Sequence, residues 1–280
     1  MGELLPPLLL VGCGKMGGAM FDGWLKEGLA PSFIVDRHRD SVPPPHQLVR
    51  SLDAVPASFR PGMIVLATKP QKVDAVLPTL APFAAHAPVL SVLAGRTVES
   101  LATATALRAC LPAGSPPPAV IRAMPNTPSA IGQGMTVCYA PPPATAADRR
   151  LCARLMSAVG EVAWIEHEDQ MDMVTAISGS GPAYVFLLAE LLEQVGIDHG
   201  LPAALARQIA RQTVAGSGAL MQASGLDAAT LRQNVTSPGG TTQAALAVLM
   251  APDAWPATLD AALAAAARRA RELSGPQPVS

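Results

Sequence analysis

The chain has 280 residues, which suits one large domain or two ordinary ones with a sizeable apolar core. Half of the residues are hydrophobic, 15% are charged and the net charge is −1, which excludes a disordered chain and offers no basic surface to nucleic acid or an anionic membrane. The four cysteines form no CxxC pair and the histidines no cluster, so we expect no metal site and no disulfide framework, and predict a reducing, cytoplasmic compartment.

The amino-terminal part alternates short runs of branched residues with helix-compatible runs. Six runs end in turn formers and predict strands, at 8–14, 32–37, 62–70, 88–95, 119–126 and 134–140. Helices are predicted between several of them, at 16–28, 71–83 and 98–111. This alternation predicts an α/β fold, in which residues 1–165 form a Rossmann-type, doubly wound, mostly parallel sheet.

A glycine loop follows the first predicted strand and opens a helix. The stretch "VGCGKMGGAM" holds Gly12, Gly14 and Gly17 in the order G-x-G-x-x-G, which suits a tight turn, a close approach by pyrophosphate and close helix packing. The helix start offers free N–H groups to a diphosphate. We therefore predict a dinucleotide site, although glycine turns also occur for structural reasons alone. The remaining loop residues assigned to it are Cys13, Lys15 and Met16.

The second predicted strand ends at Asp36, where an acidic residue usually binds the ribose of NAD. Arg37 follows directly and Arg39 lies nearby, and a guanidinium there can bind the 2′-phosphate of NADP. Solvated surface charges are the alternative interpretation of both arginines. We favour NADPH as cofactor and leave NADH possible.

The third predicted strand closes with Ala67, Thr68, Lys69 and Pro70, at the sheet edge where ligands gather. These residues are assigned to the cofactor. Lys69 either contacts the ribose or phosphate of the cofactor, or is merely exposed.

The pattern of the remaining residues, 166–280, predicts an all-helical second domain. It is rich in Ala and Leu and is interrupted only by turns. A region of this size has more apolar face than one small bundle hides, so we predict a homodimer interface, with a packed core as the alternative. No stretch consists of about 18 uncharged apolar residues in one helical span, since Glu190 and Glu193 interrupt the most apolar run, so no membrane span is expected.

The stretch "TSPGGTTQAAL" predicts an anion site at the start of a helix. Pro238 suits the first helical position, and the residues after it, Gly239, Gly240, Thr241 and Thr242, would present N–H donors that nothing in the helix satisfies. Two glycines in a first turn cost roughly 1 kcal/mol each relative to Ala, which a bound anion would offset. We expect a small carboxylate there.

Two alternatives need no ligand. A side-chain cap by Thr236 or Ser237 would satisfy the helix that follows "SPGG". A second turn, "SGSGP" at 178–182, resembles the first in composition and is either a binding turn through Ser180 or a serine cap before Pro182.

The helical half contains no lysine, because all four lysines precede residue 73. Reduction of a carbonyl needs a proton donor to oxygen, often Lys, His or Tyr, whereas an iminium already carries its proton. The sequence therefore favours an imine substrate. Thr242 is predicted as the catalytic residue, accepting a hydrogen bond from the nitrogen.

Four segments resemble the family of Δ1-pyrroline-5-carboxylate reductases, in order and spacing. They read "LATKP", "VIRAMPNTPSAIGQGMT", "ISGSGPAY" and "LRQNVTSPGGTTQAAL". The resemblance implies NADPH-dependent reduction of a small cyclic imino acid to L-proline, by a Rossmann domain followed by a helical domain that dimerises, often in rings of dimers.

The resemblance also implies roles for particular residues. Asn234 and the "GGTT" turn would meet the substrate and the nicotinamide ribose, and Glu168 would line the substrate pocket. The stretch beside the nicotinamide would be Val92, Leu93 and Ala94. No role is assigned to Asn126.

Two further interpretations stay open. One is a two-domain imine or hydroxyacid dehydrogenase that acts on another small acid, against which the missing lysine weighs for hydroxyacids. The other is a nucleotide-sensing protein without catalysis, against which the intact "SPGGTT" turn weighs.

Overall fold

The computed structural model describes residues 4–102, 107–111 and 114–275. Its contacts divide the chain into two compact units, one of Ser180–Ala266 and one of the residues before and after it. The boundary expected from the sequence, at 165/166, falls inside the first unit and stays a prediction of domain organisation.

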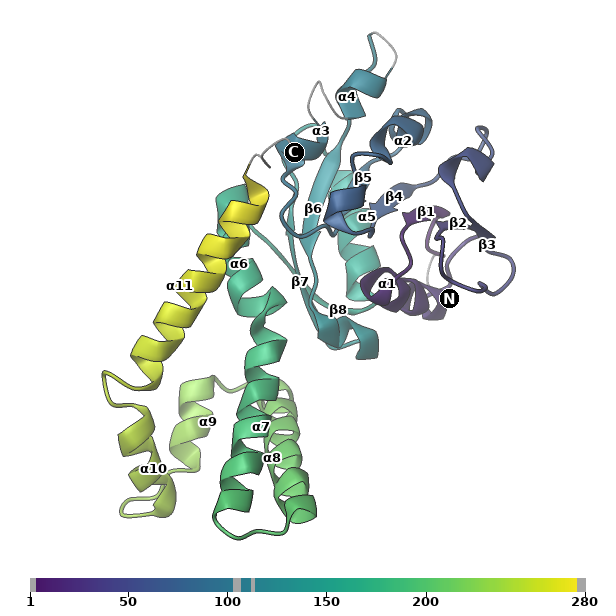
Figure 1. Ribbon diagram of the computed structural model, residues 1–280. Helices are drawn as coiled ribbons and strands as arrows, with labels where there is room; N and C mark the ends of the chain where they lie inside the picture. Colours follow the sequence, from purple (N-terminus) through teal and green to yellow (C-terminus); the bar gives the residue numbers. More distant parts are fainter. Residues whose placement is uncertain (1–3, 103–106, 112–113, 276–280) are drawn as a thin grey trace. The chain divides into compact units, whose positions relative to one another are not determined.

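The first unit contains a sheet of eight described strands in the order β3-β2-β1-β4-β5-β6-β7-β8 (Figure 1). Strands β1 to β6 pair with one another in parallel, β7 is antiparallel to β6, and β8 is parallel to β7. The mostly parallel sheet predicted from the sequence is confirmed. The strands are β1 Leu8–Val11, β2 Phe33–Val35, β3 Gln47–Val49, β4 Met63–Leu66, β5 Val89–Ser91, β6 Val120–Met124, β7 Gly134–Tyr139 and β8 Gly160–Trp164.

The sequence did not predict β3 and β8, the two edge strands. Neither contains a fully buried residue, so neither shows the continuous apolar run of a strand that is covered on both faces. β3 is also only three residues long.

Alternating side chains of the strands face two separate apolar layers. In β1, Leu8 and Leu10 belong to one layer while Leu9 and Val11 belong to the other. Helices α1 (Lys15–Lys26) and α5 (Ala146–Ser157) complete the first layer, and α2 (Leu77–Ala84), α3 (Val98–Ala102) and α4 (Leu107–Cys110) complete the second. The sheet is thus covered on both faces, as a doubly wound fold requires.

Several predicted helices are divided in the structure. The run at 71–83 splits into a 3-10 turn, η2 (Pro70–Lys72), and α2. The run at 98–111 contains α3 and α4, and residues 103–106 within it lie outside the described residues. Short 3-10 turns also lie at η1 (Leu52–Ala54), η3 (Thr127–Ile131) and η4 (Glu168–Gln170).

The expected turn at 178–182 is instead largely helical. Helix α6 (Met171–Val174) continues into a π-helical turn, η5 (Thr175–Gly179), and α7 (Gly181–Asp198) starts after Ser180. Pro182 fits at the start of α7 because the first N–H groups of a helix have no partner within it. The side chain of Ser180 does not cap α7, so the structure does not support that alternative.

The second unit consists of helices and loops. It holds α7, α8 (Ala203–Ser224), α9 (Ala228–Asn234), α10 (Thr241–Leu249) and the first part of α11 (Trp255–Ser274) (Figure 1). Helices α7 and α8 pack together, and Arg207 Nη2 lies 2.9 Å from Glu193 Oε1 between them.

This unit has almost no core of its own. Within α7 to α10, only Ala206 and Ala210 are buried, while Phe186 is 66% exposed and Val248 70%. A soluble chain rarely leaves so much apolar surface open, so this exposure favours an interface over the packed-core alternative.

One helical run, 168–198, is long and apolar enough to cross a membrane, judged by length and composition alone. Helices at the core of soluble proteins meet the same criterion, so it is weak evidence for a span.

Candidate active site

The glycine loop between β1 and α1 has the geometry that its spacing predicts. Gly12 has φ +94°, and a Cβ there would lie 2.6 Å from the carbonyl oxygen of Ala67. A Cβ on Gly17 would collide with the carbonyl oxygen of Gly12. Gly14 differs, since no atom lies within 4 Å of a Cβ placed on it. Gly12 and Gly17 therefore serve the fold, and Gly14 leaves an open approach to the backbone.

The start of α1, directly after Gly14, offers backbone N–H groups that have no acceptor in the described chain. Gly14 is the N-cap and supplies no side chain, and within the described chain the N–H groups of Lys15, Met16 and Gly17 find no acceptor. Three N–H donors at the positive end of a helix fit a diphosphate.

Asp36 is tied to the glycine loop. Its Oδ2 accepts a hydrogen bond from the Cys13 N–H at 2.7 Å, and its Oδ1 accepts from the N–H groups of His38 and Arg39, both at 2.8 Å. Burial acts to raise the pKa of Asp36, but these three backbone donors hold it below its ordinary value. The carboxylate is thus ionised and braces the loop.

The two arginines after Asp36 differ in environment. Arg37 is exposed and forms no hydrogen bond or ion pair with the part of the chain that is described. Arg39 is engaged with the protein, since its Nη1 lies 3.2 Å from Cys13 Sγ and its guanidinium lies 5.4 Å from the centre of the Phe21 ring. Burial raises the pKa of the Cys13 thiol, so it stays protonated.

The carboxyl ends of β4 and β5 lie beside the glycine loop. The Ala67 N–H donates to the carbonyl of Val11 at 2.8 Å, and the Val92 N–H donates to the carbonyl of Leu66 at 3.0 Å. The residues after β4 (Thr68, Lys69 and Pro70) and after β5 (Leu93 and Ala94) follow at the same edge. Lys69 and Ala94 are exposed, whereas the Leu93 side chain is buried.

Glu168, predicted at the substrate pocket, is held by two groups of the first unit. Its Oε1 lies 3.0 Å from Nη1 of Arg122 and accepts the Val98 N–H at 2.9 Å. Arg122 is almost completely buried and Glu168 is 22% exposed. No partner for Oε2 is present among the described residues, so this oxygen is open to a ligand. No sequence pattern pointed to Arg122, since a lone arginine inside an apolar strand has many possible partners.

Asn126, to which the sequence assigned no role, joins two segments of the first unit. Its Nδ2 donates to Ser178 Oγ at 3.3 Å, and its Oδ1 accepts the Met135 N–H at 2.9 Å. It therefore fixes the π-helical turn η5 to β7. A π-helical turn is frequent near functional sites.

The "SPGGTT" turn differs from its prediction in one respect. Helix α10 begins at Thr241 with Gly240 as N-cap, so Pro238 and both glycines precede the helix. Gly239 has φ +70°, which no helical residue adopts, and it closes the turn before the helix. The expected energetic cost of two glycines within the first helical turn is therefore wrong.

The donors of this turn are partly used by the protein. The Gly240 N–H donates to the carbonyl of Ser237 at 3.1 Å, and the Gly239 N–H donates to Gln243 Oε1 at 2.6 Å. For the N–H groups of Thr241 and Thr242, the described residues supply no acceptor. Two of the four expected donors are thus open to a ligand, and the other two shape the turn.

The side-chain cap considered as an alternative is absent from the described structure of this turn. Thr236 Oγ1 donates instead to the carbonyl of Arg232 at 2.7 Å, and α10 has no side-chain cap. Gln243, for which no role was predicted, holds the turn from within the helix. Its position four residues after Gly239 is the only sequence signal for this contact.

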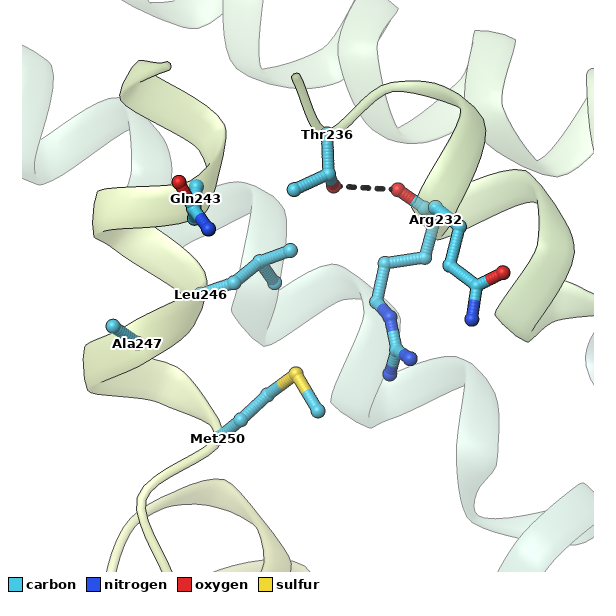
Figure 2. A pocket seen from close by; sticks show the side chains of 7 residues that line it. Arg232, Thr236, Gln243, Leu246, Ala247 and Met250 are labelled. Carbon is cyan, nitrogen blue, oxygen red and sulfur yellow. Dashed lines mark hydrogen bonds between the residues drawn. The ribbon is translucent and has the colours of Figure 1, made fainter. Parts of the chain in front are cut away.

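A hollow of about 320 Å³ lies between α9 and α10, next to the turn (Figure 2). Arg232 lines it from α9, and Leu246 and Met250 line it from α10. The dashed line in Figure 2 is the hydrogen bond from Thr236 Oγ1 to the carbonyl of Arg232, at the end of α9. Gln243 lines the hollow as well as holding Gly239. Asn234 ends α9 and is exposed, and Ser180 precedes α7 and is half-buried.

Comparison with known proteins identifies both parts of the chain. A family model for pyrroline-5-carboxylate reductase dimerisation matches residues 168–273, and one for NADP oxidoreductase, coenzyme F420-dependent, matches residues 8–95. Pyrroline-5-carboxylate reductase of Pseudomonas aeruginosa is 35% identical, over 96% of this chain and 97% of that protein. The chain belongs to the pyrroline-5-carboxylate reductase family.

Solved structures of pyrroline-5-carboxylate reductases agree with this assignment. The enzyme from Coxiella burnetii has a TM-score of 0.85 at 30% identity, covering 97% of this chain and all of that one. The enzyme from Plasmodium falciparum, solved with NADP bound, has a TM-score of 0.79 at 25% identity and covers 98% of this chain and all of that one. The NADP-binding fold and the self-associating helical part are therefore those of this reductase family.

Proposed function

We propose that this protein reduces 1-pyrroline-5-carboxylate to L-proline with NADPH. The observation that carries the proposal is the start of α10, where the N–H groups of Thr241 and Thr242 have no acceptor among the described residues. Such a helix start binds a carboxylate, and family membership over nearly the whole chain supports the same substrate.

The first unit would hold the cofactor. The N–H groups at the start of α1 bind the diphosphate, Asp36 holds the loop in shape, and the ends of β4 and β5 line the nicotinamide half with Ala67, Val92 and Ala94. When bound, NADPH supplies the hydride. The remaining proposed contacts are Lys69 and Thr68, by side chain or backbone.

The second unit would hold and orient the substrate. The N–H groups of Thr241 and Thr242 bind the carboxylate, while Gln243 keeps Gly239 in place. The Thr242 hydroxyl accepts a hydrogen bond from the protonated imine nitrogen, so the hydride adds to a carbon that is already electrophilic and no further proton is needed. Asn234 and Ser180 are proposed as further substrate contacts in this unit. Glu168, which belongs to the first unit, is proposed as a substrate-binding residue through its free Oε2.

The absence of lysine from the helical half fits an imine better than a ketone, because no ammonium is available there to protonate an oxygen. The hydroxyacid dehydrogenase alternative therefore has no support. The nucleotide-sensing alternative would not need an open donor pair at α10.

Self-association follows from the dimerisation model that covers residues 168–273 and from the exposed apolar side chains of α7 and α8. We propose that the helical run 168–198 serves this interface rather than a membrane, that dimers assemble into rings, and that the protein acts in the cytoplasm.

The direct test is turnover. Addition of 1-pyrroline-5-carboxylate to the protein and NADPH should lower the absorbance of the reduced nicotinamide and yield L-proline, identified by chromatography. A parallel assay with NADH gives the cofactor preference. If neither cofactor supports proline formation, while the protein still binds NADPH, the sensing alternative would replace the proposal.

A further inference from the structure

Three arginines gather where β2 and β3 end. Arg37 and Arg39 follow β2, and Arg50 directly follows β3. These strands are parallel neighbours, with Val35 opposite Val49, so their carboxyl ends lie side by side. The Asp36 N–H donates to the carbonyl of Val49 at 3.1 Å, which fixes the two chain segments beyond the strands close together.

Arg39 is already committed to the protein. Its Nε donates to the carbonyl of Ser41 at 3.1 Å, and its Nη2 lies 3.6 Å from Asp22 Oδ1. A guanidinium bound to a thiol, a carboxylate and a carbonyl has little capacity left for a ligand, so the sequence-based suggestion of Arg39 near the phosphate is not favoured by its contacts.

Arg50 is held differently. Its Nη1 donates to the carbonyls of Asp36 at 3.0 Å and of Arg39 at 2.7 Å, so the guanidinium lies against the peptide that joins Asp36 to Arg37. Its Nε and Nη2 have no acceptor among the described residues, and the side chain is exposed. The anchoring removes rotamer freedom before any ligand binds, which favours binding.

The carboxylate of Asp36 is already occupied by donors of the protein. Asp36 gives its carboxylate oxygens to three backbone N–H groups, so it is poorly placed to bind a ribose hydroxyl as an NAD-selecting acid would. Arg37 and Arg50 remain as cations open to a ligand.

We propose that Arg50, together with the exposed Arg37, binds the 2′-phosphate on the adenosine ribose of NADPH and thereby determines the preference for NADPH over NADH. A guanidinium binds phosphate oxygens through paired N–H groups, and Arg50 presents its free N–H groups at the edge of the sheet where the adenosine half binds in this fold. The inference rests on the cofactor half of the proposed function and is independent of the substrate.

The test uses nucleotide fragments rather than turnover. Calorimetric dissociation constants of 2′,5′-ADP and 5′-AMP are measured for the wild type, Arg50→Gln and Arg60→Gln. Arg60 is the matched control, because its Nη1 also donates to two carbonyls, those of Ala57 and Phe59. Arg60 precedes the amino end of β4, whereas Arg50 follows the carboxyl end of β3. We expect Arg50→Gln to weaken 2′,5′-ADP about tenfold, the loss of one charge-assisted hydrogen bond, and to leave 5′-AMP within about twofold.

Arg50→Lys keeps the charge but loses the planar fork, and we expect a smaller loss, of about threefold, again for 2′,5′-ADP alone. Equal weakening of both fragments by Arg50→Gln would overturn the inference, because Arg50 would then only support the loop. Unchanged binding of 2′,5′-ADP would overturn it as well. Neither outcome affects the proposed reaction, which fails only if proline is not formed.

Discussion

Arg122 Nη1 lies 3.0 Å from Glu168 Oε1, and the same oxygen accepts the Val98 N–H at 2.9 Å. One carboxylate oxygen thus connects β6, the start of α3 and η4, while the other has no partner among the described residues. Arg122 contributes the buried charge of this arrangement and positions Glu168 rather than meeting a substrate itself.

Arg122→Gln should destabilise the fold and disturb the substrate site. Glu168 loses its buried partner, and because it is partly exposed we expect a free energy of unfolding lower by about 2 kcal/mol, below the range for fully buried pairs. The KM for the imino acid should rise about tenfold. Urea unfolding measures the first effect and steady-state kinetics the second. Arg122→Lys keeps the charge and should partly restore both the free energy of unfolding and the KM.

Arg96→Gln is the control for stability, since Arg96 binds Asp74, which is 66% exposed, and should change the free energy of unfolding by at most about 1 kcal/mol. A KM that is unchanged in Arg122→Gln would remove Arg122 from the positioning of Glu168.

Thr242→Ala should lower kcat about 10–100-fold, because one hydrogen bond to the substrate nitrogen is lost in the transition state. Circular dichroism should show an unchanged fold, since the Thr242 side chain makes no hydrogen bond within the described chain. Thr258→Ala, on the exposed face of α11, serves as control. An unchanged kcat in Thr242→Ala would remove the hydroxyl from the mechanism.

Gly14→Ala and Gly12→Ala should separate cofactor binding from folding. The space around Gly14 is open, so Gly14→Ala should change the free energy of unfolding by less than about 1 kcal/mol yet weaken NADPH at least about tenfold, because the methyl group blocks the approach of the diphosphate. Gly12→Ala should lower the free energy of unfolding by several kcal/mol, because the added Cβ would clash with the backbone of Ala67 and the positive φ strains any residue other than glycine. Thermal unfolding and calorimetric binding measure the two effects. Full NADPH affinity in Gly14→Ala would place the diphosphate elsewhere.

Asp36→Asn should reduce stability in a pH-dependent manner. The pKa of Asp36 is lower in the folded protein than its ordinary value, so its stabilising effect is complete above the ordinary carboxyl pKa and is lost as the pH falls through the folded pKa. We expect the variant to be less stable by about 1 kcal/mol at neutral pH, discounted for partial exposure, and the difference to shrink below about pH 4. Urea unfolding across this range measures it.

Asp40→Asn is the matched control, because Asp40 is exposed and forms no hydrogen bond with the described residues. A difference between wild type and Asp36→Asn that grows in acid would contradict the proposed bracing by an ionised carboxylate.

Phe186→Glu should weaken self-association. Phe186 is 66% exposed in the single chain, and a two-fold interface would bury it in both copies, so a charge there is penalised twice. We expect a dimer dissociation constant raised at least about 100-fold, measured by analytical ultracentrifugation. Gln208→Glu adds the same charge at an exposed polar position of α8 and should have little effect. An unchanged dissociation constant would place the interface elsewhere.

The sequence predicted the central strands and the glycine loop because both depend on local composition. Continuous runs of branched residues mark strands buried on both faces, and the G-x-G-x-x-G spacing of Gly12, Gly14 and Gly17 is a motif within six residues. The edge strands β3 and β8 escaped prediction because half-exposed strands carry no such run.

By itself, the sequence determined the fold class, the dinucleotide loop, the apolar helical half and the two threonines at the start of α10, since each follows from residue types at short spacing. Only the tertiary structure decided that Gln243 occupies the Gly239 N–H, that Arg122 holds Glu168 and that Arg50 rather than Arg39 has a guanidinium open to a ligand. The reason is physical, because a hydrogen bond depends on where folding brings two groups, and for partners 46 residues apart such as Arg122 and Glu168 the sequence gives no distance.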